Sequence, residues 1–198
     1  MIGDLVTLAR ENAPICVVAL PLAAAALCAF SPSGRLAWAL ASLASLAAAA
    51  LAIDLAIGVQ NAGARLYALG GWQAPLGVTL RIDGLGAFGL SLVAAASALS
   101  LLSTIGPLMR EVERARRPIA IALCLLVTAG ALGMIAAGDM FTAFCFMQMS
   151  LISAAALVGL GADADRRAAP AALRVLFWSA TGGIFFAFGA GLLFLATG

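Results

Sequence analysis

Four polar side chains lie inside or at the edge of long apolar stretches: Asp54, Asp139, Gln148 and Arg174. Polar groups that ionise within a bilayer are energetically costly, so they are candidates for ion or proton pathways by default. Three of them also have a structural explanation. Asp54 lies near the end of its apolar stretch within reach of water, Asp139 can cap a helix, and Arg174 can extend its long side chain to the membrane surface.

The composition excludes a water-soluble globule and several classes of active site. The chain has 198 residues, of which 64% are hydrophobic and 10% charged, whereas soluble domains have about 45–50% and about 25%. Every base is arginine, and the sequence contains no lysine and no histidine. Histidine metal sites, Ser-His-Asp triads and catalytic lysines therefore cannot be built from this chain alone. The net charge of +2 argues against nucleic-acid binding.

The hydropathy pattern predicts an all-α integral membrane protein with six transmembrane helices in a single membrane domain over residues 1–198. A membrane-spanning helix needs about 20 mostly apolar residues. The apolar stretches that meet this requirement cover approximately residues 13–30, 36–59, 85–109, 119–137, 140–161 and 170–197. On the last helix, Gly183, Ala187 and Gly191 form a small-residue face suited to close packing, either within the bundle or against another chain.

The segment 60–83 is too polar to cross a membrane, and we expect it to form a short surface β-hairpin between the second and third helices. Val78, Leu80 and Ile82 alternate with polar residues, a period of two that is typical of a half-buried strand. Tyr67 and Trp72 are expected at the membrane interface, where amphipathic rings are favoured.

The distribution of arginine predicts the orientation, because short cytoplasmic loops accumulate positive residues. The loops after the first, third and fifth predicted helices hold seven arginines, whereas the N-terminus and the other two loops hold three. We therefore expect both termini and the hairpin to face away from the cytoplasm in a bacterial inner membrane.

Three sequence segments resemble one family of membrane subunits. Residues 138–148 (GDMFTAFCFMQ) resemble the G-D-L-F-N-L-x-V-F-F-E segment of the antiporter-like subunits of respiratory complex I and of Mrp-type cation/proton antiporters. Residues 171–174 (AALR), followed by Gly182 and Gly183, look like the A-A-L-K helix of that family. Residues 69–72 (LGGW) and 80–85 (LRIDGL) look like its outer hairpin and the start of its third helix. The resemblance covers roughly residues 66–198 and implies the N-terminal half of such a subunit.

The resemblance implies a proton path whose residues are altered here. Gln148 occupies the position of the family's glutamate, and Arg174 that of a basic residue on the sixth helix. An amide does not titrate near neutral pH, and a guanidinium with a pKa above about 12 keeps its proton. The family's later lysines and histidines fall beyond the segment that matches. Gln148, Arg174 and Asp139 are thus candidate degenerate proton-path positions, with no catalytic residue and no metal ligand predicted.

The function expected from these residues is that of a non-pumping structural or accessory subunit of a larger energy-converting membrane complex. Its partners would be other membrane subunits and the lipid bilayer, with no cofactor and no catalysis of its own. An alternative is the active half of a split proton or cation/proton transporter that a partner chain completes. A third interpretation, an enzyme with quinone or haem chemistry, lacks histidine ligands and any cysteine attachment motif.

Overall fold

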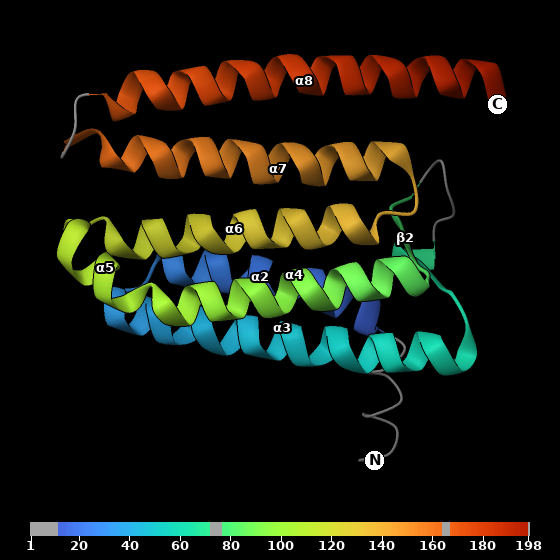
Figure 1. Cartoon of the computed structure of the whole chain (residues 1–198), viewed down its shortest axis with the longest axis horizontal. Coiled ribbons are helices and arrows are strands. Elements are labelled where there is room, and N and C mark those ends of the chain that lie inside the picture. The colour runs from blue at the N-terminus through green and yellow to red at the C-terminus, as the bar shows by residue number, and fades with distance from the viewer. Residues whose placement is uncertain (1–11, 72–76, 164–166, 198) are drawn as a thin grey trace.

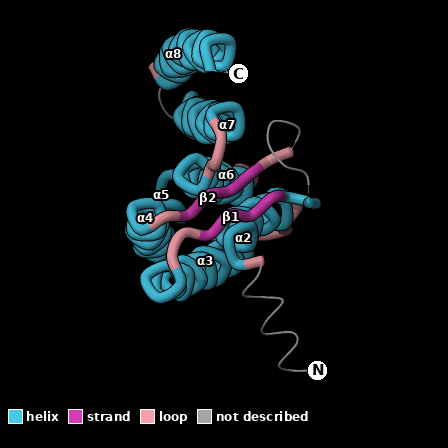
Figure 2. The backbone as a smooth tube through the Cα atoms, turned by 90° about the vertical axis from the view of Figure 1, so that its right-hand side faces the viewer, coloured by secondary structure: helices cyan, strands magenta, loops and turns pink. Residues whose placement is uncertain are grey.

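Long apolar helices lie side by side along one direction, with a small β-hairpin across one end (Figures 1 and 2). The computed structural model describes residues 12–71, 77–163 and 167–197. The helices are α2 (Ala13–Ala29), α3 (Gly34–Ala62), α4 (Gly84–Ser103), α5 (Ile105–Glu111), α6 (Arg117–Ala136), α7 (Met140–Gly159) and α8 (Ala168–Thr197). The strands are β1 (Arg65–Ala68) and β2 (Thr79–Ile82), and the short 3-10 turns are η1 (Leu69–Gly71) and η2 (Leu160–Asp163).

Five of the described helices are long and apolar enough to span a membrane: α3, α4, α6, α7 and α8. Helix α2 is also apolar, but at 17 residues it is shorter. The predicted fold class, an all-α membrane protein with a hairpin, is therefore confirmed. The chain is a multi-pass membrane protein.

Helices α2, α3, α4 and α6 form the packed part of the bundle. Small residues allow the close contacts: on α3, Ala37, Ala41, Ala48 and Ala52 are at most 1% exposed. Helices in lipid gain little from mutual hydrophobicity and associate where small side chains let their backbones approach. The alanine-rich sequence of α3 thus accounts for its central place in the bundle.

Helices α7 and α8 are stacked outside this group, one beyond the other (Figure 2). Helix α7 approaches α6 closely at Gly130, where a Cβ would lie 2.7 Å from both the Phe146 carbonyl oxygen and Ser150 Cβ. The Ser150 hydroxyl also donates a hydrogen bond of 3.1 Å to the Val127 carbonyl of α6. In its most apolar stretch only 6% of α8 is buried, against 56% for α6. Most of the surface of α8 is therefore uncovered apolar side chains.

The third predicted span, 85–109, is divided in the structure. Helix α4 ends at Ser103, and the short helix α5 begins at Ile105. Pro107 explains the break, because proline has no N–H to donate to the carbonyl four residues earlier and its ring clashes there. At the break, the Thr104 hydroxyl donates a 2.6 Å hydrogen bond to the Ser100 carbonyl.

The predicted hairpin is confirmed. Strands β1 and β2 pair antiparallel, with Tyr67 opposite Leu80. Leu80 and Ile82 are fully buried while Arg81 between them is exposed, which is the expected period of two. The Tyr67 hydroxyl donates a 2.7 Å hydrogen bond to Asn12 Oδ1, which ties the hairpin to the start of α2. Trp72, predicted at the interface, lies outside the described residues.

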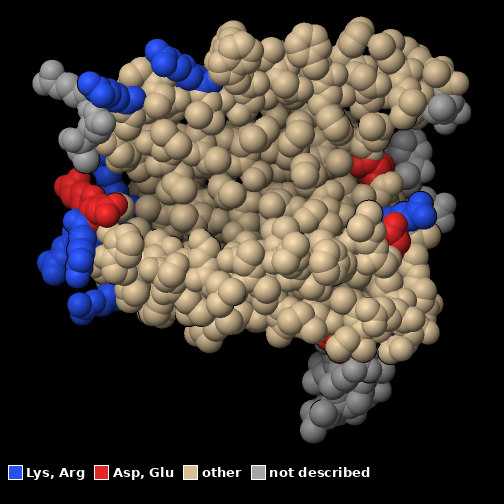
Figure 3. Space-filling view, viewed as in Figure 1, with Lys and Arg blue, Asp and Glu red and all other residues tan. Residues whose placement is uncertain are grey.

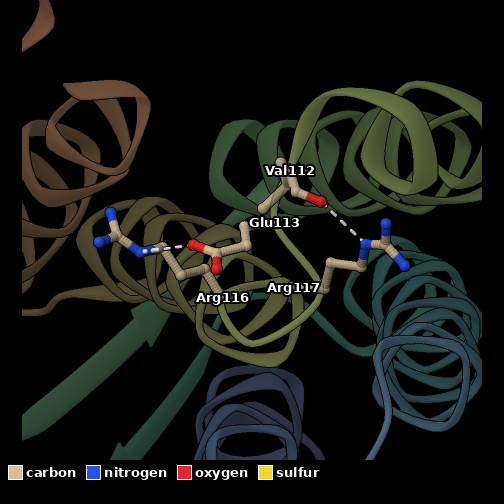
Figure 4. Close-up of polar contacts among 4 residues, drawn as sticks. All are labelled: Val112, Glu113, Arg116 and Arg117. Carbon is tan, nitrogen blue, oxygen red and sulfur yellow. Dashed lines mark hydrogen bonds and ion pairs between the residues drawn. The ribbon is translucent and has the colours of Figure 1, made fainter. Parts of the chain in front are cut away.

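The opposite end of the bundle carries most of the arginines (Figure 3). Arg117 has a structural role there that the sequence did not predict. Its guanidinium donates a hydrogen bond of 2.9 Å to the Val112 carbonyl (Figure 4) and one of 2.8 Å to the Met109 carbonyl. Its side chain also packs on Gly34, where a Cβ would lie 2.7 Å from Arg117 Cβ. Arg117 therefore joins α5, the start of α6 and the start of α3. Arg10 and Arg166, which contributed to the predicted orientation, lie outside the described residues.

Candidate functional site

Gln148 lies at the middle of α7 and faces α8. It is the ninth residue of a 20-residue helix, about 13 Å along the axis from Asp139. Its side chain packs on Gly183 of α8, where a Cβ would lie 2.6 Å from Gln148 Oε1 and 2.7 Å from Nε2. Only glycine at this point of α8 leaves room for the amide.

The Gln148 amide is packed but not fully hydrogen-bonded. Its Oε1 is buried and accepts no hydrogen bond from any described residue. Among the described residues the amide packs on Gly183, but no donor reaches its Oε1. One helical turn away on each helix, the Phe144 and Phe186 rings stack with their centroids 6.3 Å apart, which adds a second contact between α7 and α8.

Arg174 lies far from Gln148. It is exposed on α8, nine residues before Gly183, which corresponds to about 13 Å along the helix. Within the described part of the chain, Arg174 makes no hydrogen bond or ion pair that would link it to the amide. The two positions therefore form no contact pair.

Asp139 caps α7 and also holds the hairpin. Its Oδ1 accepts a hydrogen bond from the Thr142 backbone N–H at 2.7 Å, the N-cap geometry expected from the sequence. Its Oδ2 accepts a second bond, of 3.2 Å, from the hydroxyl of Thr79 on β2. The backbone of the preceding Gly138 donates to the Thr79 carbonyl at 2.8 Å. The α6–α7 junction is thus clamped to the hairpin.

Hydrogen bonding keeps Asp139 ionised. Partial burial raises the pKa of this carboxyl. The hydrogen bonds from Thr142 and Thr79 lower the pKa by more than burial raises it, so the pKa lies below its ordinary value. A carboxylate with a lowered pKa does not exchange protons near neutral pH. Asp139 therefore acts as a structural anion.

Asp54 lies deeper than its predicted span implied. Helix α3 continues to Ala62, three residues past the predicted end, so Asp54 lies eight residues, or about 12 Å, before its end. The guanidinium of Arg65 from β1 lies over Gly58, one helical turn further along α3. The Asp54 side chain is exposed, and its helix α3 lies on the far side of the bundle from α8 (Figure 2).

These positions do not assemble into one ionisable relay. Gln148 is neutral at all ordinary pH values, Arg174 and Asp139 hold fixed charges, and the three lie at different depths. No group of three or more metal-ligating side chains occurs among the described residues. The sequence predicted close packing at Gly183 but not its contact with Gln148, and it gave no indication of the contact between Thr79 and Asp139, because local spacing does not show which distant segments meet.

Comparisons with known proteins agree with the resemblance stated above. Over 158 residues, or 80% of its length, the chain is 37% identical to NADH-quinone oxidoreductase subunit N of Desulforudis audaxviator. Its fold matches a chain in the structure of the membrane-bound sulfane sulfur reductase, an archaeal respiratory membrane complex, with a TM-score of 0.80 and 28% identity over 93% of this chain. No family model matches the sequence.

The similarity to antiporter-like subunits of respiratory complexes is therefore shown. The chain spans 30% of the length of the first relative and 37% of that of the second.

The cap predicts the response of stability to mutation and pH. Asp139→Ala should lower the free energy of unfolding by about 1–2 kcal/mol, whereas Asp139→Asn, which still caps, should cost less. Because the folded-state pKa is lowered, the stabilisation from the charge is complete above the unfolded pKa of about 3.9 and is lost as the pH falls through the folded value. Unfolding measured in mixed micelles between pH 3 and 7 gives both the effect of the variants and the pH dependence of the free energy of unfolding. Equal stabilities for the aspartate and alanine proteins at pH 7 would contradict the clamp.

The contact between Gln148 and Gly183 predicts a coupled pair. Gly183→Ala should destabilise by about 1 kcal/mol, because its new Cβ displaces the amide. In a Gln148→Ala background the same change should be neutral or stabilising, since alanine favours the helix. A double-mutant cycle of unfolding free energies measures the coupling, expected at about 1 kcal/mol. Gly189→Ala, which has no neighbour within 4 Å among the described residues, is the matched control. Additive effects at Gly183 would show that the contact is absent.

Proposed function

We propose that this chain, similar over most of its length to subunits of respiratory membrane complexes, is a non-pumping structural subunit of a larger energy-converting assembly. The similarity to NADH-quinone oxidoreductase subunit N supports membership of such an assembly. The observation that carries the non-pumping role is the state of Gln148. A neutral amide packed between α7 and α8, with Arg174 about 13 Å along α8 from Gly183, provides no site that takes up and releases a proton.

The uncovered surface of α8 supports the inclusion of this bundle in a larger assembly. Phe177, Trp178, Phe185, Phe188 and Leu195 are each more than 60% exposed on this helix. Apolar side chains on a membrane helix face either lipid or neighbouring helices. We assign further membrane helices of the assembly to this surface, because its aromatic side chains offer large area for packing. Purification in mild detergent should recover companion membrane subunits, and recovery of a lone monomer would contradict the assignment.

The decisive test is proton movement by the assembled complex in vesicles. Gln148→Leu should lower stability by about 1 kcal/mol or less and leave proton translocation unchanged, because the amide carries no proton. Gln148→Glu introduces a titratable group at the same depth and is the informative partner variant. Loss of translocation in Gln148→Leu, with assembly intact, would replace the present proposal by the split-transporter alternative.

The proposal also includes the orientation. The arginine-rich end would face the cytoplasm of a bacterial inner membrane, with the hairpin and both termini on the other side. Arg114 and Leu69 are exposed at opposite ends of the bundle. In intact cells an impermeant maleimide should label Leu69→Cys directly but Arg114→Cys only after permeabilisation. The reverse labelling pattern would invert the topology.

A further inference from the structure

A shallow groove of about 540 Å³ lies between α4 and α6 at the hairpin end. Its rim carries two opposite charges, Arg81 of β2 and Asp83 at the start of α4. Its walls are apolar and include Phe88, Gly89 and Ile135. The groove therefore changes from charged to apolar within a few residues, as the membrane does between its surface and its core.

The apolar part follows the seam between the two helices. Gly89 keeps the groove open at this seam. A Cβ at this position would lie 3.4 Å from Ile135 Cγ2 and would narrow the groove. Beside it, the Phe88 ring is 65% exposed on a helix of spanning length and faces outward. The apolar lining on α4 runs from Leu85 to Gly89, about 6 Å along the helix, so it would contact the first part of an acyl chain next to the rim.

The two charges at the rim do not neutralise each other. Arg81 points outward from β2, because Leu80 and Ile82 on either side are buried. Asp83 uses Oδ1 to accept the Gly86 backbone N–H at 2.8 Å, which leaves its other oxygen available. Within the described residues, neither side chain makes an ion pair. A ligand with one anionic and one cationic group matches this rim.

We propose that the groove binds a phospholipid with a primary-amine headgroup, of the phosphatidylethanolamine type, from the leaflet on the hairpin side. Arg81 would bind the phosphate through charge-assisted hydrogen bonds. The Asp83 carboxylate would accept a hydrogen bond from the ammonium group, which a choline headgroup cannot donate. An anionic headgroup would meet the carboxylate without compensation. Free phosphate would make no use of the apolar seam.

Photo-crosslinking tests the proposal with the chain and its co-purifying subunits in phosphatidylcholine nanodiscs. Phosphatidylethanolamine with a diazirine in its acyl chain should label Phe88 and Ile135, and unlabelled phosphatidylethanolamine should compete. Arg81→Gln should reduce this labelling about tenfold through loss of the charged hydrogen bonds, whereas Arg81→Lys should retain most of it. Labelling of Phe88 and Ile135 that is unchanged in Arg81→Gln would overturn the proposal.

Two further variants test the seam and the amine separately. Gly89→Leu fills the groove and should abolish labelling, while Gly182→Leu adds the same volume on α8, with no described neighbour within 4 Å, and should not. Asp83→Asn keeps the helix cap but removes the charge, so labelling by the amine lipid should fall to the level of phosphatidylglycerol. Equal labelling by both lipids in the unmodified chain, or competition by inorganic phosphate, would refute recognition of an amine phospholipid.

Discussion

Close backbone approach at small residues is the constraint on which this bundle depends. Apolar side chains gain little free energy by exchanging lipid contacts for contacts with one another, so helices in lipid associate through close van der Waals packing. Alanine on α3, Gly130 and Gly133 on α6 and Gly183 on α8 each provide such a contact. The outer layers pack through these glycines: Gly130 and Gly133 of α6 admit side chains of α7, and Gly183 of α8 admits the Gln148 side chain of α7.

A second constraint acts at the hairpin end, where the helix ends leave backbone N–H groups without partners inside the helix. Asp139 accepts a hydrogen bond from one such N–H in the first turn of α7. Through its bond from Thr79, it also holds β2 against the α6–α7 junction. An isolated two-stranded hairpin is only marginally stable in water. Here Leu80 and Ile82 are buried in the bundle and Tyr67 bonds Asn12 beside α2, so the hairpin is stabilised by the helices that it covers.

The polar groups of the chain lie at different places in the bundle and have different structural roles. Arg117 connects helix ends, Asp139 caps, and Arg81 with Asp83 forms a charged rim at the surface. The middle of α7 and α8 carries the Gln148 amide and the hydroxyls of Ser150 and Thr181, none of which takes up or releases a proton near neutral pH. This distribution favours a structural role over proton transfer, and it is consistent with α8 presenting a broad apolar surface to other membrane components.

The sequence by itself determined the fold class, the approximate spans, the hairpin and the cap at Asp139, because these depend on hydropathy and on interactions between residues close in the chain. The family resemblance also followed from local motifs. The break at Pro107 was readable but was missed, since apolarity continues across it. Only the tertiary structure decided which side chains meet across helices: Gln148 with Gly183, Asp139 with Thr79, and Arg117 with Gly34. Such contacts depend on how whole helices pack and rotate against one another, and no local pattern along the chain encodes that geometry.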